Sequence, residues 1–516
     1  MQCGLVQCSA RAGDFAGNLA HLGEILEQAP EAELYCLPPN ALCGVTVASL
    51  GLWQAYARAQ EQALSLLAAR HSAKTLLVPY LQAFNHNDKL GCVLLAHGCR
   101  KKISLNSLTV QGNLAFGTFR LGSHRVGILL VVQSQPDLYP QFFFPPWTSS
   151  WPGQKPDCLL VLSAIAWREG LQRELEGRYS DLARTFDLPV AVVSAVGAED
   201  GMLYPGMSLV LDRQGTLRSR GLAFAEDIVL TQTEKITAAP QEQEALWEAL
   251  VMGTRDFVHH CGLSRAFVGL SGGLDSALVL AIACAALGAD NVTAVFMPSP
   301  YTSQASREDA AELIRNLAVP SFTVPIEPLM ASLTQALAPS LEAFPVRAGD
   351  VTFENLQARI RAVILSALAN RAQGLVLNTS NKSEAAMGYS TLYGDTIGAL
   401  AVIGDLTKTQ VYVLATWYRN HFPRSLEIPR RILEKAPSAE LAPNQKDSDS
   451  LPVYAELDPQ IEQILQGRAE YSDLTRRLLG AEFKRRQEPL ALFVSSRPFT
   501  AICRYPVSGR FQPVLA

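Results

Sequence analysis

The chain has 516 residues, of which 48% are hydrophobic and 18% are charged, and its formal net charge is −4. This length predicts two or three domains, and the composition excludes a disordered or fibrous protein. The weak negative charge argues against nucleic-acid and membrane-surface binding, and no apolar segment reaches the ~20 residues that span a bilayer.

The cysteines and the first residues of the chain indicate in which cellular compartment the protein is found. Ten cysteines occur without any Cys-x-x-Cys pair, which argues against a zinc ribbon or a disulfide framework and favours reduced thiols. The first residues lack the basic region and apolar core of a signal peptide. We therefore expect a soluble cytoplasmic protein.

Short apolar runs in the first half alternate with helical patterns, which predicts a layered α/β domain. The expected strands are 34–37, 75–79, 91–96, 126–132, 158–162 and 189–193, and the expected helices are 19–27, 52–71 and 180–186. A polar stretch, 231–244, then precedes a helix at 245–261. We place the boundary near residue 240, which gives domains 1–240 and 241–516.

The second half alternates strand and helix in the manner of a doubly wound parallel sheet. Its expected strands are 266–270, 291–297, 321–325 and 374–378. Ligands of such folds bind beyond the carboxyl ends of the strands. The polar, proline-containing segment 437–459 is expected to form a mobile lid or an ordered loop over that site.

A glycine turn joins the 266–270 strand to a helical run at 277–287. Its backbone N–H groups, at the positive end of the helix dipole, would cradle a polyphosphate. The expected ATP-binding residues are Gly269, Leu270, Ser271, Gly272, Gly273, Leu274, Asp275 and Ser276. Because a carboxylate opposes a bare phosphate, Asp275 suggests a bridging Mg²⁺. The spacing is not the Walker pattern, and it resembles the loop of the N-type ATP pyrophosphatases.

Further segments extend this resemblance to a family. They are Glu-Asn-Leu-Gln-Ala-Arg-Ile-Arg at 354–361, Thr-Ser-Asn-Lys-Ser-Glu at 379–384, Gly-Tyr at 388–389, Tyr-Gly-Asp at 393–395, Asp-Leu-Thr-Lys at 405–408, Pro-Ser-Ala-Glu-Leu at 437–441 and Lys-Arg-Arg-Gln at 484–487. In this order they resemble an NAD synthetase. The resemblance implies amidation of nicotinic acid adenine dinucleotide (deamido-NAD) through an acyl-adenylate, with release of pyrophosphate and AMP.

The resemblance also implies roles for individual residues. Asp275 and Glu384 are the expected Mg²⁺ ligands, and Thr379 is expected to contact ATP. Lys382 and Lys408 could offset charge as pyrophosphate leaves, and with Asp275 they are the expected catalytic residues. The expected deamido-NAD-binding residues are Asn355, Glu384, Asp395 and Lys484.

Each of these assignments has a plainer alternative. Glu354, Arg359 and Arg361 could form a solvated helix face, and Asp395 could be a turn residue. Asp405 with Lys408 could be a surface ion pair. Asp447 and Asp449 are expected to be solvated lid residues. Pro300 stands where some relatives carry a basic residue, which removes one expected charge contact.

The first half resembles the nitrilase-type amidohydrolase domain found in front of many NAD synthetases, most clearly at 196–208. In active relatives a Glu–Lys–Cys triad hydrolyses glutamine. Here the Glu position is Pro39, the Lys position is Lys102 and the Cys position is Val131. Since proline cannot accept a proton through its side chain and valine has no nucleophilic atom, we expect a catalytically silent domain.

The nitrogen donor is therefore expected to be free ammonia, from solution, through a shielded path or from a partner glutaminase. The alternative is a glutamine-dependent enzyme with an unrecognised nucleophile, Cys43 or Cys99. The silent domain would serve structure and assembly, and the resemblance implies a homo-oligomer, a dimer or larger. A tRNA-thiolating enzyme, a GMP synthetase and a non-catalytic binding protein fit the residues less well.

Overall fold

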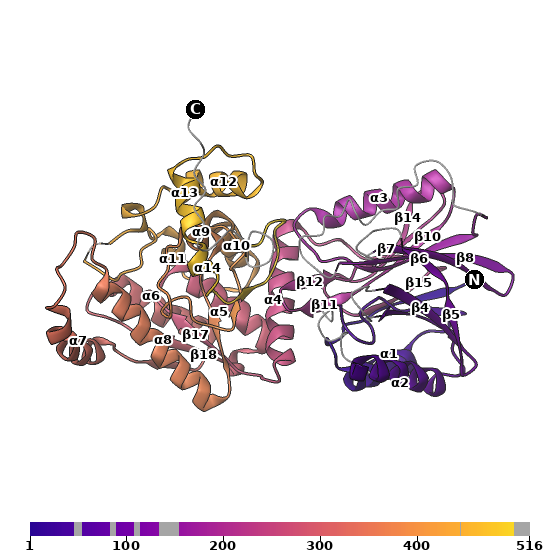
Figure 1. Cartoon of the computed structure of the whole chain (residues 1–516), viewed down its shortest axis with the longest axis horizontal. Helices are drawn as coiled ribbons and strands as arrows, with labels where there is room; N and C mark the ends of the chain where they lie inside the picture. Colours follow the sequence, from indigo (N-terminus) through magenta and orange to yellow (C-terminus); the bar gives the residue numbers. More distant parts are fainter. Residues whose placement is uncertain (46–53, 83–88, 108–113, 134–153, 444, 500–516) are drawn as a thin grey trace. The chain divides into compact units, whose positions relative to one another are not determined.

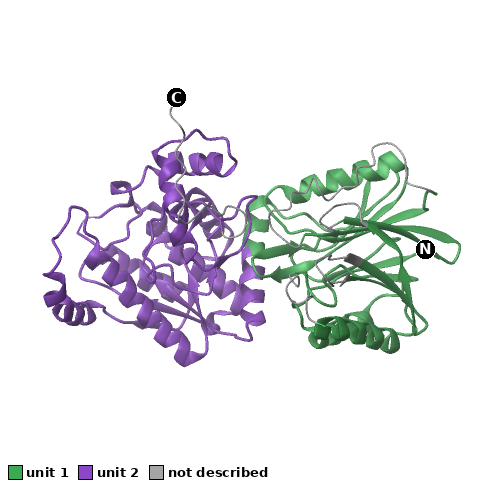
Figure 2. Cartoon of the chain, viewed as in Figure 1, with its two compact units in different colours: residues 1–249 green, residues 250–516 purple. Residues whose placement is uncertain are grey.

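The computed structural model describes residues 1–45, 54–82, 89–107, 114–133, 154–443 and 445–499. The chain divides into two compact units, residues 1–249 and 250–516 (Figure 2). The division falls inside helix α4 (Glu242–His260), a little beyond the expected boundary near residue 240.

Unit 1 contains two sheets and a hairpin. The first sheet has the order β15-β1-β2-β3-β4-β5, and the second has the order β16-β14-β13-β10-β9-β8-β7-β6. Their strands are β1 (Cys3–Gln7), β2 (Leu34–Cys36), β3 (Leu76–Gln82), β4 (Lys89–Ala96), β5 (Cys99–Ile103), β6 (Leu105–Ser107), β7 (Leu114–Leu121), β8 (His124–Val132), β9 (Cys158–Ala164), β10 (Val190–Ser194), β13 (Leu209–Leu211), β14 (Leu217–Arg220), β15 (Asp227–Leu230) and β16 (Lys235–Ile236). The hairpin pairs β11 (Val196–Glu199) with β12 (Met202–Pro205).

Helices cover the outer faces of these sheets. Helices α1 (Phe15–Gln28) and α2 (Gln54–Arg70) share one apolar core with the first sheet, and α3 (Leu171–Phe186) shares another with the second. Figure 1 shows the strands of unit 1 between α3 on one side and α1 and α2 on the other. The predicted layered α/β domain is confirmed. The expected strands correspond to β2, β3, β4, β8, β9 and β10, whereas β1, β5 to β7 and β11 to β16 were not predicted.

Unit 2 is built on one parallel sheet with the order β19-β18-β17-β20-β21-β22. Its strands are β17 (Ala266–Leu270), β18 (Val292–Phe296), β19 (Ser321–Thr323), β20 (Leu375–Asn378), β21 (Leu400–Ala401) and β22 (Leu490–Ala491). Its helices after α4 are α5 (Leu274–Leu287), α6 (Gln304–Leu317), α7 (Glu327–Leu341), α8 (Thr352–Ala372), α9 (Lys382–Met387), α10 (Lys408–His421), α11 (Arg430–Glu434), α12 (Tyr454–Leu465), α13 (Asp473–Gly480) and α14 (Glu482–Arg485).

The predicted doubly wound sheet is confirmed, and the order of its strands decides where the site lies. Strand β17 is central: β18 and β19 extend the sheet on one side of it, and β20, β21 and β22 extend it on the other. The strand order therefore reverses between β17 and β20. Ligands of such sheets bind at this point, beyond the carboxyl ends of the strands. The two-residue strands β21 and β22 were not predicted, because two apolar residues leave no periodicity in a sequence.

None of the described helices combines the length and the apolar character that crossing a membrane requires.

Candidate active site

The predicted phosphate loop lies between β17 and α5. Gly273 is the N-cap of α5, and no side chain caps this helix end. Within the loop, the Ser271 hydroxyl accepts a hydrogen bond from the Gly273 N–H at 3.1 Å and lies 3.1 Å from the Ser276 hydroxyl. Backbone N–H groups at the start of an uncapped helix suit an anionic ligand.

A large pocket opens at this loop, with a volume of about 1610 Å³ that includes its open mouth. All predicted ATP-binding residues except Gly272 line it, Thr379 among them. Gly272 has φ +80° and turns away from the pocket toward α6. Its part is to shape the turn, because only glycine adopts this conformation without strain.

Two carboxylates and one ammonium group meet beside the loop. Lys408, the first residue of α10, forms an ion pair with Asp275, and its Nζ lies 3.7 Å from Glu384. The Asn381 side-chain amide also donates to Asp275 at 3.1 Å. The structure thus brings together three predicted site residues from three separate segments, as parallel-sheet topology requires.

The electrostatics of this cluster fit a divalent cation. Burial, and then the nearby charge of Asp275, raise the pKa of Glu384 well above its usual range. A hard cation between the two oxygens would relieve this repulsion, and Mg²⁺ is commonly held by one or two carboxylates together with substrate phosphates. No cluster of three or more His, Cys, Asp or Glu suited to a metal occurs among the described residues.

Lys382 lies elsewhere, contrary to the prediction that it serves the phosphates. Its side chain is 0% exposed, and its Nζ lies 2.9 Å from Glu462, 3.3 Å from Asp405 and 2.9 Å from the Ser495 hydroxyl. It does not line the pocket. Lys382 therefore acts as the centre of a buried ion-pair cluster that holds α9 against α12.

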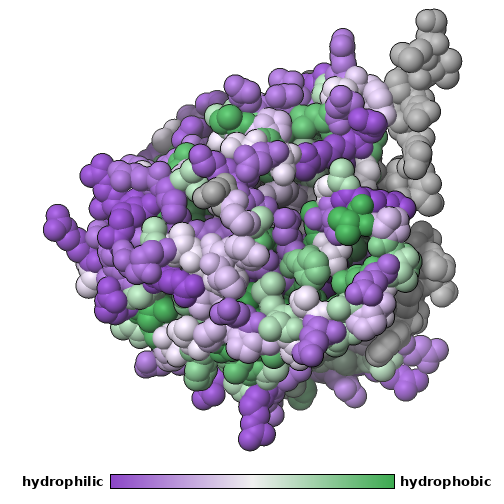
Figure 3. All heavy atoms as spheres, turned by 90° about the vertical axis from the view of Figure 1, so that its left-hand side faces the viewer, coloured by the Kyte–Doolittle hydropathy of each residue, from purple (hydrophilic) through white to green (hydrophobic). Residues whose placement is uncertain are grey.

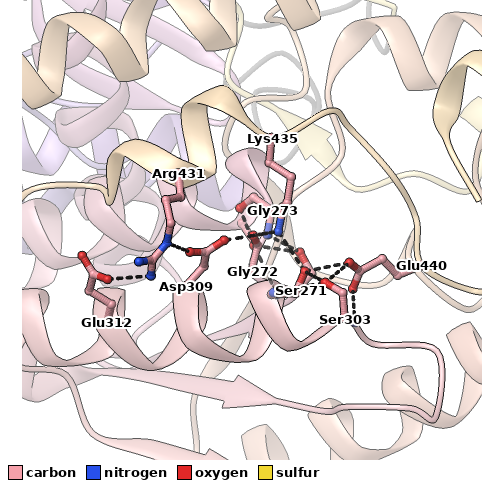
Figure 4. Close-up of polar contacts among 11 residues, drawn as sticks. Ser271, Gly272, Gly273, Ser303, Asp309, Glu312, Arg431, Lys435 and Glu440 are labelled. Atoms are coloured by element: carbon pink, nitrogen blue, oxygen red, sulfur yellow. Dashed lines mark hydrogen bonds and ion pairs between the residues drawn. The ribbon is translucent and has the colours of Figure 1, made fainter. Parts of the chain in front are cut away.

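A segment after α11 covers the loop. The Lys435 ammonium donates to the Gly272 carbonyl and to the Ser306 hydroxyl, both at 2.8 Å. Glu440 accepts hydrogen bonds from the hydroxyls of Ser303 and Ser306, both at 2.7 Å (Figure 4). Residues 435–441 all line the pocket, so this segment forms one of its walls.

A second set of ion pairs connects α11 and the segment after it to α6. The Arg431 guanidinium bridges Asp309 at 2.9 Å and Glu312 at 2.8 Å (Figure 4). Asp309 is fully buried and also lies 3.5 Å from the Lys435 ammonium. No pattern in the sequence predicts this network, because its acidic members on α6 and its basic members at 431 and 435 are more than 100 residues apart.

The predicted deamido-NAD residues divide into two groups. Glu384 and Asp395 line the pocket. Asn355 and Lys484 do not, and both contact the segment that leads to Asp395: Asn355 accepts from the Thr391 hydroxyl at 2.7 Å, and the Lys484 ammonium donates to the Ser390 carbonyl at 2.6 Å. In this structure these two residues position the segment 388–395.

Two further residues, Arg361 and Asp447, line the pocket, although neither was predicted to be a site residue. Arg361 lines the pocket and donates to the Met297 carbonyl at 3.1 Å, and burial lowers its pKa to about 10. Asp447, expected to be solvated, is 5% exposed and accepts a hydrogen bond from the Tyr454 hydroxyl at 2.9 Å. Charged residues on a helix or in a lid give no sequence signal for the direction in which they point.

Unit 1 contains the three residues that the resemblance assigns to the triad positions, and two of them are buried. Val131 is 0% exposed within β8 and packs in the apolar core beneath α3, and Pro39 is buried after β2. Lys102 is exposed on β5, which is an edge strand. Of the alternative nucleophiles, Cys43 is buried with its thiol directed to the Gly44 carbonyl, and Cys99 is exposed on β5.

The turn at Gly272 yields a prediction. A Cβ at this position would lie 2.4 Å from the backbone oxygen of Ser306, so Gly272→Ala must displace the loop. We expect the KM for ATP to rise about tenfold or more in steady-state assays. Gly467→Ala is the matched control, because Gly467 also has a positive φ (+69°) but open space around its Cβ. An unchanged KM in the Gly272 variant would contradict the assigned role.

Comparison with known proteins places this site in a family. A profile of the NAD synthase family matches residues 246–487. A curated glutamine-dependent NAD(+) synthetase from Thermotoga maritima is 30% identical over 99% of both chains. Another from Synechocystis sp. is 39% identical over 375 residues, which are 68% of this chain and 66% of that relative.

A solved structure agrees over the whole chain. Glutamine-dependent NAD+ synthetase from Acinetobacter baumannii, in complex with ADP, has 28% identity, a TM-score of 0.73 and coverage of 98% of both chains. The fold is therefore that of a two-domain protein with a nitrilase-type unit and a parallel-sheet synthetase unit. The chain belongs to the NAD synthase family. The names of these relatives favour glutamine as nitrogen donor over the expectation of ammonia alone.

Proposed function

We propose that the chain converts deamido-NAD to NAD with consumption of ATP. The observation that carries this proposal is the convergence of Asp275, Glu384 and Lys408 at an uncapped helix start. A carboxylate is a poor electrophile because its leaving group would be oxide. The substrate carboxylate oxygen therefore attacks the α-phosphorus of ATP, the bond to the β-phosphate oxygen breaks, and pyrophosphate leaves. The nitrogen of ammonia then attacks the acyl carbon and expels AMP.

The residues of this chain have separable tasks in that sequence. The N–H groups of the first turn of α5, residues 274–276, bind phosphate oxygens, and Lys408 neutralises charge that develops as pyrophosphate departs. Thr379 and Arg361 also line the pocket, where they would contact the rest of the nucleotide. Asp275 and Glu384 would hold Mg²⁺, which supplies Lewis-acid polarisation of the phosphates. The segment 435–441 excludes water from the acyl-adenylate.

The source of ammonia has two candidates, each with its own support. The names of the relatives support glutamine hydrolysis in unit 1. The residues of this chain support free ammonia, from solution or from a separate glutaminase, because Pro39 and Val131 replace the base and the nucleophile. Burial also raises the pKa of the unit 1 thiols Cys8, Cys92 and Cys158, which opposes thiolate formation at these three positions. The hydrogen bond between Cys3 and Cys36 lowers the pKa of Cys3 and raises that of Cys36.

One assay separates the candidates. NAD formation from deamido-NAD and ATP is measured with ammonium and with glutamine for the full chain, Cys43→Ala and Cys99→Ala. If ammonia is the donor, glutamine supports turnover no faster than the ammonia that contaminates it, and both variants match the parent. Glutamine turnover that either variant abolishes would establish the glutamine-dependent alternative. No turnover with either donor would contradict the proposed reaction.

We also propose that the chain assembles with copies of itself through unit 2. Helix α7 has no buried residue, and it exposes Leu329, Leu333 and Leu337 along one face. Phe344 and Val346, just beyond it, are 72% and 87% exposed. Figure 3 views the side that carries α7 and shows apolar residues gathered among polar ones. Exposed apolar clusters of this kind mark protein interfaces, and light scattering in solution tests the assembly.

A cytoplasmic location completes the proposal. All nine described cysteines are free thiols, which suits a reducing compartment.

A further inference from the structure

A second, much smaller hollow adjoins the active-site pocket. Asn378, Ser380 and Asn381 line it on one side, and Glu488, Pro489 and Phe499 on another. It has room for about one water-sized molecule. Asn378 and Ser380 line the large pocket as well, so these two residues form the wall that the two hollows share.

Glu488 is unusual among the carboxylates of unit 2. Its Oε1 is shielded from solvent, and among the described residues its side chain has no hydrogen bond and no ion pair. The Arg485 guanidinium, the nearest source of compensation, is engaged with Glu482 and with the carbonyls of Ala385 and Ala386. A shielded carboxylate oxygen without a partner is costly, so Oε1 calls for a cation or a donor in the hollow.

The charged residues around Glu488 do not supply the cation or the hydrogen-bond donor that its Oε1 requires. The pKa of Glu488 is raised to about 7, chiefly by burial. Asp395 and Glu482 add to this rise, and Arg485 and Lys484 oppose it. The Lys484 ammonium is itself engaged, since it donates to the carbonyls of Gly388 and Ser390. Above that pKa the carboxylate is charged and is available to a small cation.

We propose that this hollow binds the nitrogen donor as an ammonium ion, with Glu488 as its counter-ion. Ammonium has the size of water and carries only N–H donors. It would find an acceptor in Glu488 Oε1, which has no hydrogen-bond partner among the described residues, and Ser380 lines the same hollow. The site rests on the proposed function, since only a reaction that consumes ammonia needs ammonium beside the acyl-adenylate.

The proposed step balances in atoms and charge. Ammonium transfers one proton to the Glu488 carboxylate, which leaves neutral ammonia and a carboxylic acid. The ammonia lone pair forms the C–N bond, the bond between the acyl carbon and the AMP oxygen breaks, and the departing phosphate takes the proton that nitrogen loses. Glu488 then returns its proton to solvent. A carboxyl whose pKa lies near neutrality suits such transfers.

The test compares two nucleophiles in the full chain and in Glu488→Gln. Near neutral pH ammonium is a cation, whereas hydroxylamine is mostly neutral and needs no counter-ion. We expect the KM for ammonium to rise about ten- to a hundredfold in the variant, because a charge-assisted hydrogen bond is lost. The KM values for hydroxylamine, ATP and deamido-NAD should stay within about twofold. Glu470→Gln, an exposed substitution in the same unit, is the matched control.

The outcomes separate this proposal from the proposed function. If neither nucleophile gives a product with the parent chain, the proposed function fails. If both give product and Glu488→Gln leaves the KM for ammonium unchanged, or raises both KM values equally, the ammonium site alone fails.

If the variant does not fold, the pH dependence of the KM for ammonium in the parent chain tests the proposal. Its KM for total ammonium should stay constant between the pKa of Glu488 and that of ammonium. A site for neutral ammonia would instead require about a tenfold rise for each pH unit lost, and that result would overturn the proposal.

Discussion

Asp275→Asn is expected to lower the kcat of NAD formation by about 10²–10³-fold. The substitution keeps the shape of the side chain but removes one of the two carboxylates that face the loop. It also leaves Lys408 with Glu384 as its remaining partner in the ion-pair cluster. Pyrophosphate release, measured over a range of Mg²⁺ concentrations, should show both the lower rate and a weaker response to Mg²⁺.

The control for Asp275 is Asp473→Asn on α13. The Asp473 side chain is 95% exposed and forms an ion pair only with Arg476, one helical turn away. Loss of its charge should leave the rate within about twofold of the parent. If Asp275→Asn retains the parent rate at saturating ATP, Asp275 is not a ligand of the metal–phosphate complex.

Lys408→Met and Lys382→Met are expected to separate catalysis from stability. Both lysines are buried, and both lie in ion-pair clusters. Lys382→Met leaves the buried Asp405 without its cation and should lower the free energy of unfolding by about 3–5 kcal/mol. Since Lys382 does not line the pocket, the folded protein should keep its KM for ATP.

Lys408→Met should show the reverse pattern. We expect kcat to fall by about 10²-fold or more, because the cation that lies between Asp275 and Glu384 beside the loop is lost. The loss of unfolding free energy should be smaller than for Lys382→Met, since Glu384, whose pKa is already raised, can take up a proton. Urea unfolding and initial rates measure the two effects. Equal loss of kcat in both folded variants would show that Lys382 also acts on the phosphates.

Much of unit 2 was predictable because its key signals are local. The strand at 266–270, the two glycines and the helix that follows form one continuous segment, so its geometry is fixed within about ten residues of sequence. Asp275 lies in the first turn of that helix, and its position at the phosphates follows directly. The sheet was predictable for the same reason, because each longer strand carries its own apolar run.

A site residue was predictable only where it comes directly after one of these strands in the chain. Thr379 comes immediately after β20, and the structure places it in the pocket as expected. Glu488 and Lys435 follow no strand, and their environments depend on segments more than 90 residues away. Sequence spacing contains no information about contacts of that range.

The amino-acid sequence by itself determined the parallel sheet, the phosphate loop and the place of Asp275. The sequence could not show which of Lys382 and Lys408 lies at the phosphate loop. Both are the first residue of a helix, and both follow an N-cap of the same type, Asn381 and Thr407, with a capping box. Only the packing of α9 and α10 against distant segments directs one ammonium to Asp275 and the other to Asp405, because the direction of a side chain at a helix start is set by its tertiary neighbours.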